Sequence, residues 1–169
     1  KSFFKIKEDD QSEYHRFESI KKFLLKKDFD GFSSDDLFIM QFIKKGWGQD
    51  IAALSNMAES LVNLSIKNPN DNQYRYLIDE VVKRAIHPEV NPYKKDIYSV
   101  RSLGKFGYYL EHLNIVLGCY QRIAGDRYLE LNERISKHLL NNSMSYHNYH
   151  ADLLPNVNMK WSADQAAII

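Results

Sequence analysis

The sequence has 169 residues, of which 44% are hydrophobic and 13% aromatic, and its 23 Lys and Arg nearly balance its 22 Asp and Glu. This content predicts a globular domain with a sizeable core and excludes a disordered chain. The balanced charge gives no general attraction to nucleic acid or acidic lipid. No apolar run approaches the roughly 18 residues that span a bilayer. We therefore expect a soluble protein without a nucleic-acid or membrane partner.

Apolar residues recur at helical spacing through most of the chain. After a short strand or extended arm over 1–6, the pattern predicts helices over about 10–27, 37–43, 51–66, 74–85, 108–124 and 128–139, and a last one from Ser162 onward. A connection over 90–105, with one short turn near 98–100, separates the fourth and fifth helices. A polar and aromatic segment over 143–160 precedes the last helix. No phosphate-binding glycine loop is present, and we expect no cofactor.

The helix predicted over 108–124 is apolar around most of its circumference, and its polar residues form one narrow stripe. The helix over 128–139 has an ordinary one-sided apolar face. We therefore expect an antiparallel hairpin of one enclosed and one half-exposed helix. A helix, a turn with an acidic residue and then a Tyr occur in this order at Asp71 and Tyr74, and again about 55 residues later at Asp126 and Tyr128. A period of this size predicts repeated helical hairpins.

The fold class we predict is all-α, with repeated antiparallel helical hairpins curled into a partial (α/α) toroid. The whole chain, 1–169, is expected to be a single helical domain, with an N-terminal helix pair over 1–46 and hairpin repeats over 47–169. Lys1 is not an initiator Met, and the sequence stops within a helical pattern at Ile169. We therefore expect a fragment of a larger toroid, either cytoplasmic or exported after removal of a leader. Its compartment and oligomeric state stay open.

Aromatic residues are expected at the N-terminal ends of the enclosed helices. Trp47, Tyr108 and Trp161 would reach one rim from three successive repeats, with Tyr149 and His150 from the segment before the last helix. Aromatic planes pack on the C–H face of a sugar ring. These residues are therefore candidate sugar-binding groups, and Asn114 of the polar stripe joins them. The alternative is that the rings only cap the hydrophobic core.

Two carboxylates in the first turns of helices are candidate acid/base groups, Glu111 and Asp164. Asp164 could instead complement its helix dipole. Glu111 is harder to explain in this way, because its helix is too enclosed to hold a carboxylate without a purpose or a partner. His112 is a third candidate, for which a hydrogen bond to the core or to a neighbouring helix competes with catalysis.

Two further groups of residues are expected to have no catalytic role. His147, His150 and Asp152 match no strong zinc spacing, so we predict no metal site. Cys119 has no second cysteine to pair with and is expected to be a small core residue.

Three segments together carry a resemblance: Gly107-Tyr-Tyr-Leu-Glu-His-Leu-Asn114, Ala124-Gly-Asp-Arg-Tyr128 and Lys160-Trp-Ser-Ala-Asp-Gln165. In this order they resemble the (α/α) toroid enzymes that act on glycans, which include glycoside hydrolases, polysaccharide lyases and sugar epimerases. The resemblance covers 47–169 and is architectural, and it implies about half of a complete toroid. It assigns no catalytic role to any particular residue of this chain.

The sequence thus favours an enzyme, a carbohydrate-active domain that hydrolyses or epimerises a glycan with paired carboxylates in an aromatic-lined cleft. Its partner would be a small molecule or an oligosaccharide. Two alternatives remain: a helical-repeat module that binds a protein or peptide, and an (α/α) enzyme for a cyclic or terpenoid substrate that is not a sugar.

Overall fold

The computed structural model describes residues 10–25, 47–104 and 106–142. These parts contain no strand, and their elements are α1 (Asp10–Leu24), α2 (Trp47–Lys67), α3 (Gln73–Ile86), the 3-10 turn η2 (Ile97–Ser99), α4 (Gly107–Ala124) and α5 (Leu129–Asn142). The all-α prediction is confirmed for them. The arm over 1–6 and the helices predicted over 37–43 and from Ser162 lie outside the described residues.

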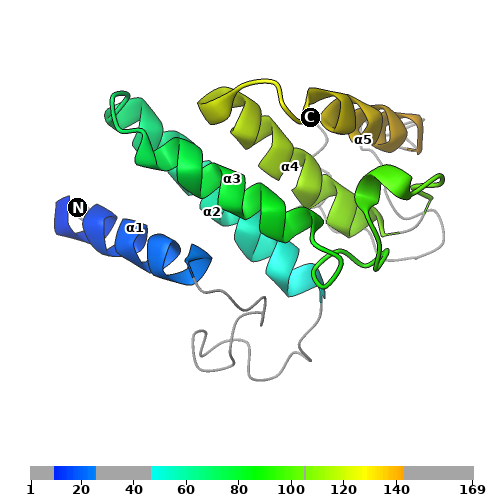
Figure 1. Ribbon diagram of the computed structural model, residues 1–169, viewed down its shortest axis with the longest axis horizontal. Coiled ribbons are helices and arrows are strands. Elements are labelled where there is room, and N and C mark those ends of the chain that lie inside the picture. The colour runs from blue at the N-terminus through cyan, green and yellow to red at the C-terminus, as the bar shows by residue number, and fades with distance from the viewer. Residues whose placement is uncertain (1–9, 26–46, 105, 143–169) are drawn as a thin grey trace, which may run out of the picture.

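The centre of the arrangement is α4, which packs against α2, α3 and α5. In Figure 1, α2 and α4 run in the same direction, α3 runs back antiparallel to both, and α5 lies on the side of α4 away from α1. α1 packs on α3. The helices predicted over 51–66, 74–85, 108–124 and 128–139 are present as α2, α3, α4 and α5, with each bound within four residues of the expected one.

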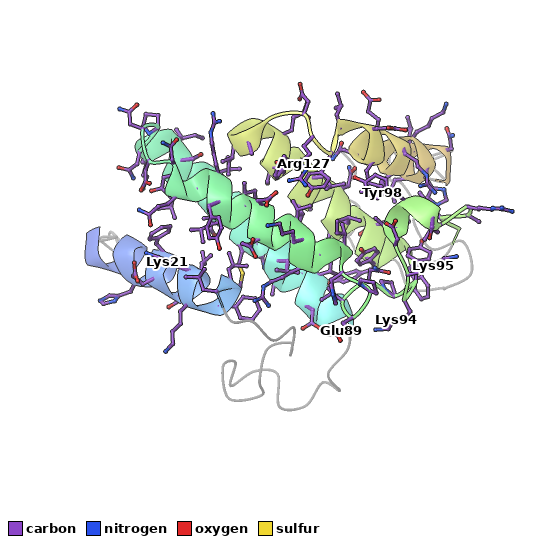
Figure 2. The ribbon with its side chains drawn as sticks, viewed as in Figure 1. Lys21, Glu89, Lys94, Lys95, Tyr98 and Arg127 are labelled. Atoms are coloured by element: carbon purple, nitrogen blue, oxygen red, sulfur yellow. The ribbon has the colours of Figure 1, made fainter. Side chains whose placement is uncertain are left out.

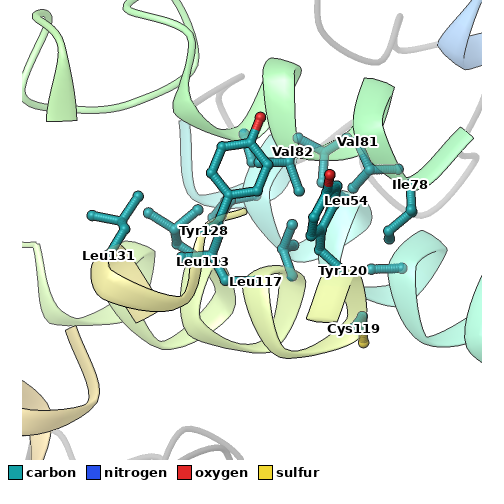
Figure 3. Packing of buried hydrophobic residues seen from close by; sticks show 14 of the residues in the cluster. Leu54, Ile78, Val81, Val82, Leu113, Leu117, Cys119, Tyr120, Tyr128 and Leu131 are labelled. Atoms are coloured by element: carbon teal, nitrogen blue, oxygen red, sulfur yellow. The ribbon is translucent and has the colours of Figure 1, made fainter. Parts of the chain in front are cut away.

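The core explains why α4 is the central helix. Its buried side chains point in several directions around the helix, and they are Tyr109, Leu110, Glu111, Leu113, Val116, Leu117, Cys119 and Tyr120. Figure 3 shows Leu113 and Leu117 in one cluster with Ile78 and Val82 of α3. Truncating a fully buried Leu to Ala typically costs about 2–5 kcal/mol, so this cluster is a main source of stability. The prediction that this helix is enclosed is confirmed.

The ends of the helices follow local chemistry. Residues 47–50, which precede the helix predicted over 51–66, form the first turn of α2. Gly48 is tolerated there because the first backbone N–H groups of a helix have no partner inside it, and Asp50 complements the helix dipole. Asp71 accepts a hydrogen bond from the backbone N–H of Gln73 at 2.9 Å, so the acidic residue of this turn satisfies the first N–H of α3, next to the N-cap residue Asn72. α4 ends at Gly125, whose φ of 102° suits glycine.

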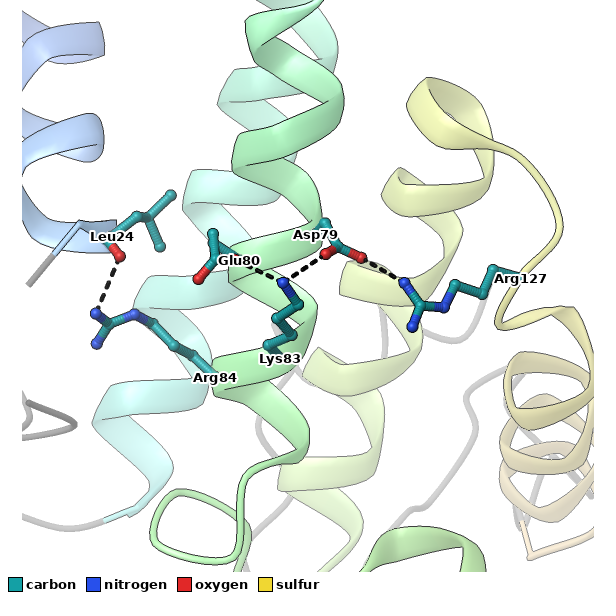
Figure 4. Close-up of polar contacts among 6 residues, drawn as sticks. All are labelled: Leu24, Asp79, Glu80, Lys83, Arg84 and Arg127. Carbon is teal, nitrogen blue, oxygen red and sulfur yellow. Dashed lines mark hydrogen bonds and ion pairs between the residues drawn. The ribbon is translucent and has the colours of Figure 1, made fainter. Parts of the chain in front are cut away.

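Polar contacts join the helices at their edges (Figure 4). Arg84 of α3 donates to the carbonyl oxygen of Leu24 at the end of α1, at 3.0 Å, and thereby fastens α1 to the hairpin. Asp79 of α3 pairs with Lys83 at 2.8 Å and with Arg127 at 3.1 Å. Because Arg127 lies between α4 and α5, this carboxylate connects the two hairpins.

The connection between α3 and α4 is held against α5. Arg134 donates to the carbonyl oxygen of Val100, and His138 makes a backbone hydrogen bond with Leu103. Although these two side chains lie one turn apart on an outer helix, they do more than solvate its outer face, because both lie partly buried over the connection. None of the described helices is long and apolar enough to cross a membrane.

Candidate functional site

Four of the predicted site residues lie in the first two turns of α4: Tyr108, Glu111, His112 and Asn114. Trp47 is the first residue of α2, and its side chain is outside what the structure describes. Because α2 and α4 run in the same direction, their N-terminal ends lie at the same end of the helical bundle (Figure 1). Four other candidates, Tyr149, His150, Trp161 and Asp164, lie outside the described residues. Their roles stay predictions.

His112 is joined to α2 by a hydrogen bond. Its Nδ1 lies 2.8 Å from the hydroxyl oxygen of Ser55, which is 2% exposed in the third turn of α2. Burial lowers the pKa of His112 below its ordinary value. The imidazole is therefore neutral at pH 7, with one nitrogen as donor and the other as acceptor. The expectation of a hydrogen bond to a neighbouring helix is confirmed, and this bond leaves the second nitrogen for other chemistry.

The ring of Tyr108 packs on the imidazole of His112. Their centroids are 4.5 Å apart and the planes meet at 65°, an edge-to-face arrangement across one turn of α4. Two contacts, one with Ser55 and one with Tyr108, therefore restrict the rotation of His112. The contact of Tyr108 with a sugar stays a prediction.

Glu111 is 1% exposed, although it is ionisable and lies on a helix otherwise filled with apolar side chains. Glutamate is almost never buried to this degree unless it is paired. In such a low-dielectric setting the charge of a carboxylate acts more strongly than at the surface. The prediction that this position is enclosed is confirmed, and its role in acid/base chemistry stays a prediction.

Asn114 connects α4 to α5. Its side-chain oxygen accepts a hydrogen bond from the Ser136 hydroxyl at 2.9 Å, and its backbone oxygen accepts one from the Asn132 side chain at 3.0 Å. These bonds orient the amide of Asn114 toward α5. Its contact with a substrate stays a prediction.

Cys119 is buried in α4. Burial raises the pKa of its thiol to about 11, so the thiol is protonated at neutral pH and unreactive as a nucleophile. The described residues hold no group of three His, Cys, Asp or Glu side chains that could bind a metal ion. His147 and Asp152, considered as metal ligands, lie outside these residues.

Ser55 was not identified from the sequence as a site residue. The available signal was a polar residue on the inward side of an enclosed helix, next to Leu54 and one turn before Ala58 and Glu59. A serine there is usually explained by a bond to its own helix, and Ser55 does make one, to the carbonyl oxygen of Ala52. Its pairing with His112 depends on the register of α2 against α4, which the sequence does not give.

The described site is therefore a tyrosine, an imidazole, a serine hydroxyl and a buried carboxylate near the common end of α2 and α4. It can transfer protons, since imidazole and carboxylate are the usual general acid and base groups. Comparisons with protein-family models, with curated proteins and with solved structures find no match.

Proposed function

We propose that the chain is a carbohydrate-active domain of an enzyme, and that Glu111 and His112 transfer protons during hydrolysis or epimerisation of a glycan. The observation that carries the proposal is the burial of Glu111, at 1% exposure, one position before His112, whose imidazole is held by two contacts. Ionisable groups held in buried positions with specific partners are typical of functional sites.

The proposal includes the curved arrangement of a partial (α/α) toroid, in which the N-terminal ends of the inner helices share one rim. Two features support it: the common direction of α2 and α4, and the Ser55–His112 bond near their N-terminal ends. Tyr74 and Tyr128, which occupy matching places in the two hairpins, are both buried. In the proposed site Asp164 supplies the second carboxylate, and Trp47, Tyr108, Tyr149 and Trp161 supply the sugar-stacking rings.

The experiment combines binding with turnover. Binding of an oligosaccharide panel is followed through the side-chain NMR signals of Tyr108 and His112, and turnover through release of reducing ends and uptake of solvent deuterium into the sugar. We expect at least one glycan to shift both ring signals. Glu111→Gln should then reduce turnover by about 10²- to 10⁴-fold, the usual contribution of a general acid or base.

The matched control is Glu130→Gln, because Glu130 is an exposed glutamate in the first turn of α5. It should leave both binding and turnover unchanged. If no glycan shifts either ring signal, the proposal is wrong. The same holds if Glu111→Gln, shown to be folded by circular dichroism, turns over as fast as the control.

A second candidate function is a module that binds a protein or peptide. It is favoured by Tyr98, which is 50% exposed, and by Arg127, whose side chain is 63% exposed (Figure 2). Exposed tyrosine and arginine are enriched in protein interfaces. Retention of a peptide from a random library, lost in Tyr98→Ala but kept in Glu111→Gln, would favour this function over the first.

A further inference from the structure

The hydroxyl of Ser55 lies between two hydrogen-bonding partners. Its oxygen is 2.8 Å from the carbonyl oxygen of Ala52 and 2.8 Å from Nδ1 of His112. Both are ordinary hydrogen-bond distances for these atoms. A serine hydroxyl has a single proton, so it can donate to one partner only and must accept from any other.

The carbonyl decides which partner receives that proton. The oxygen of Ala52 can only accept, so a separation of 2.8 Å requires the Ser55 proton to lie between the two oxygens. If the proton pointed at His112 instead, two oxygen lone pairs would face each other at this distance. The bond to the imidazole must therefore be donated by Nδ1–H, and the neutral ring then has its lone pair on Nε2.

We infer that Ser55 is a positioning residue, which holds His112 in the Nδ1–H tautomer with Nε2 as the proton-accepting atom of the site. The inference rests on the proposed function for the use of that atom, but not for the tautomer itself. Nε2 would accept a proton from a hydroxyl or ring carbon of the bound sugar. The resulting imidazolium keeps its Nδ1–H on Ser55 and returns the Nε2 proton later in the reaction.

The opposite assignment would make Ser55 a nucleophile activated by His112, and two observations argue against it. The side chain is 2% exposed, and its proton is already donated to Ala52. Nucleophilic serines need access to the substrate and a proton directed at the base. Tyr108 adds a further constraint, because its edge-to-face contact helps to keep the ring from turning over.

The tautomer can be measured directly by long-range hydrogen–nitrogen NMR on the full chain, with the His112 signals assigned from their loss in His112→Gln. We expect a pyrrole-type Nδ1 and a pyridine-type Nε2 in the unmodified protein. In Ser55→Ala the ratio of the Nδ1–H to the Nε2–H tautomer should fall about tenfold, since one net hydrogen bond corresponds to roughly that factor. Ser55→Thr, which retains a hydroxyl, should restore the original pattern.

Ser65→Ala is the matched control. Ser65 is on the same helix and donates to the carbonyl oxygen of Val62 at 2.8 Å, in the same i to i−3 manner as Ser55. It should leave the His112 signals unchanged. An Nε2–H tautomer in the unmodified protein, or an unchanged ratio in Ser55→Ala, would overturn the inference.

The tautomer measurement and the sugar assay can fail separately. A chain with the Nδ1–H tautomer that binds no glycan would refute the proposed function but keep the assignment of Ser55. A chain that turns over a glycan with the Nε2–H tautomer would refute the assignment of Ser55 alone. With an active chain and the expected tautomer, Ser55→Ala should reduce kcat more than it changes KM, because Ser55 acts through His112 and not on the substrate.

Discussion

The hydroxyl of Tyr109 offers a sharp test of how α3 and α4 are joined. It donates to the carbonyl oxygen of Ala85 at 2.8 Å, and the side chain is fully buried. Ala85 is the second-last residue of α3, so its carbonyl is one of the last four that have no donor within the helix. The N–H that would come next, that of Glu89, donates to the His87 ring instead. Tyr109 therefore caps α3 from the neighbouring helix.

Replacing Tyr109 with Phe removes the hydroxyl that makes this cap and keeps the ring. The aromatic ring stays, so no large cavity forms and the transfer free energy of the ring is kept. The loss is one net hydrogen bond, about 0.5–1.5 kcal/mol, or the desolvation cost of the carbonyl left behind, about 1–3 kcal/mol. We expect Tyr109→Phe to reduce the free energy of unfolding by about 1–3 kcal/mol.

The measurement is urea unfolding followed by circular dichroism, in which the midpoint should fall while the slope m stays constant. Tyr76→Phe is the control, because Tyr76 is an exposed tyrosine on the same hairpin. Its change should stay within about 0.5 kcal/mol. Equal effects of the two substitutions would refute the assignment of Tyr109 as the cap of α3.

Three further outcomes are expected. Gly125→Ala should destabilise the protein by about 1–3 kcal/mol in the same urea assay, because a φ of 102° strains any L-residue. Gly118→Ala, inside α4, should instead stabilise it by about 0.5–1 kcal/mol. Steric crowding plays no part in either result, because an added Cβ meets no atom within 4 Å at either position. Asn114→Ala should cost about 1 kcal/mol, since Ser136 loses its acceptor, and the double variant with Ser136→Ala should cost less than the sum of the single changes. Burial raises the pKa of Tyr93 to about 12, above the value near 10 of an unfolded chain. Its contribution to stability should therefore be complete below pH 10 and fall as pH rises toward 12, and Tyr93→Phe should reduce that fall in unfolding curves measured across this range.

The helices were predictable because their apolar residues follow the helical period and their turns carry ordinary signals. The turn over 68–71 separates α2 from α3, and Gly125 follows the end of α4, both close to the expected places. The burial of Glu111 was predictable too, since its helix has apolar residues on nearly every side. These features depend only on residues near one another in the sequence.

Contacts between helices were not predictable in the same way. The bond between Ser55 and His112 joins residues 57 positions apart, and the bond from Arg134 to Val100 joins residues 34 apart. Each bond depends on how one helix is rotated and shifted along its neighbour. The spacing of apolar residues in the sequence does not determine either quantity. A period also cannot tell that Asn114 turns its amide toward α5.

The central position of α4 has a consequence for biosynthesis. The α2–α3 hairpin leaves the ribosome before α4, so the face that carries Ile78 and Val82 is uncovered until residues 107–124 follow. Until then the nascent chain exposes an apolar surface of the kind that chaperones bind and that leads to aggregation with neighbouring chains. A pause in translation after α3 has left the ribosome and before α4 has done so would lengthen this exposure, so the chain's yield in cells should depend on how fast that stretch is decoded.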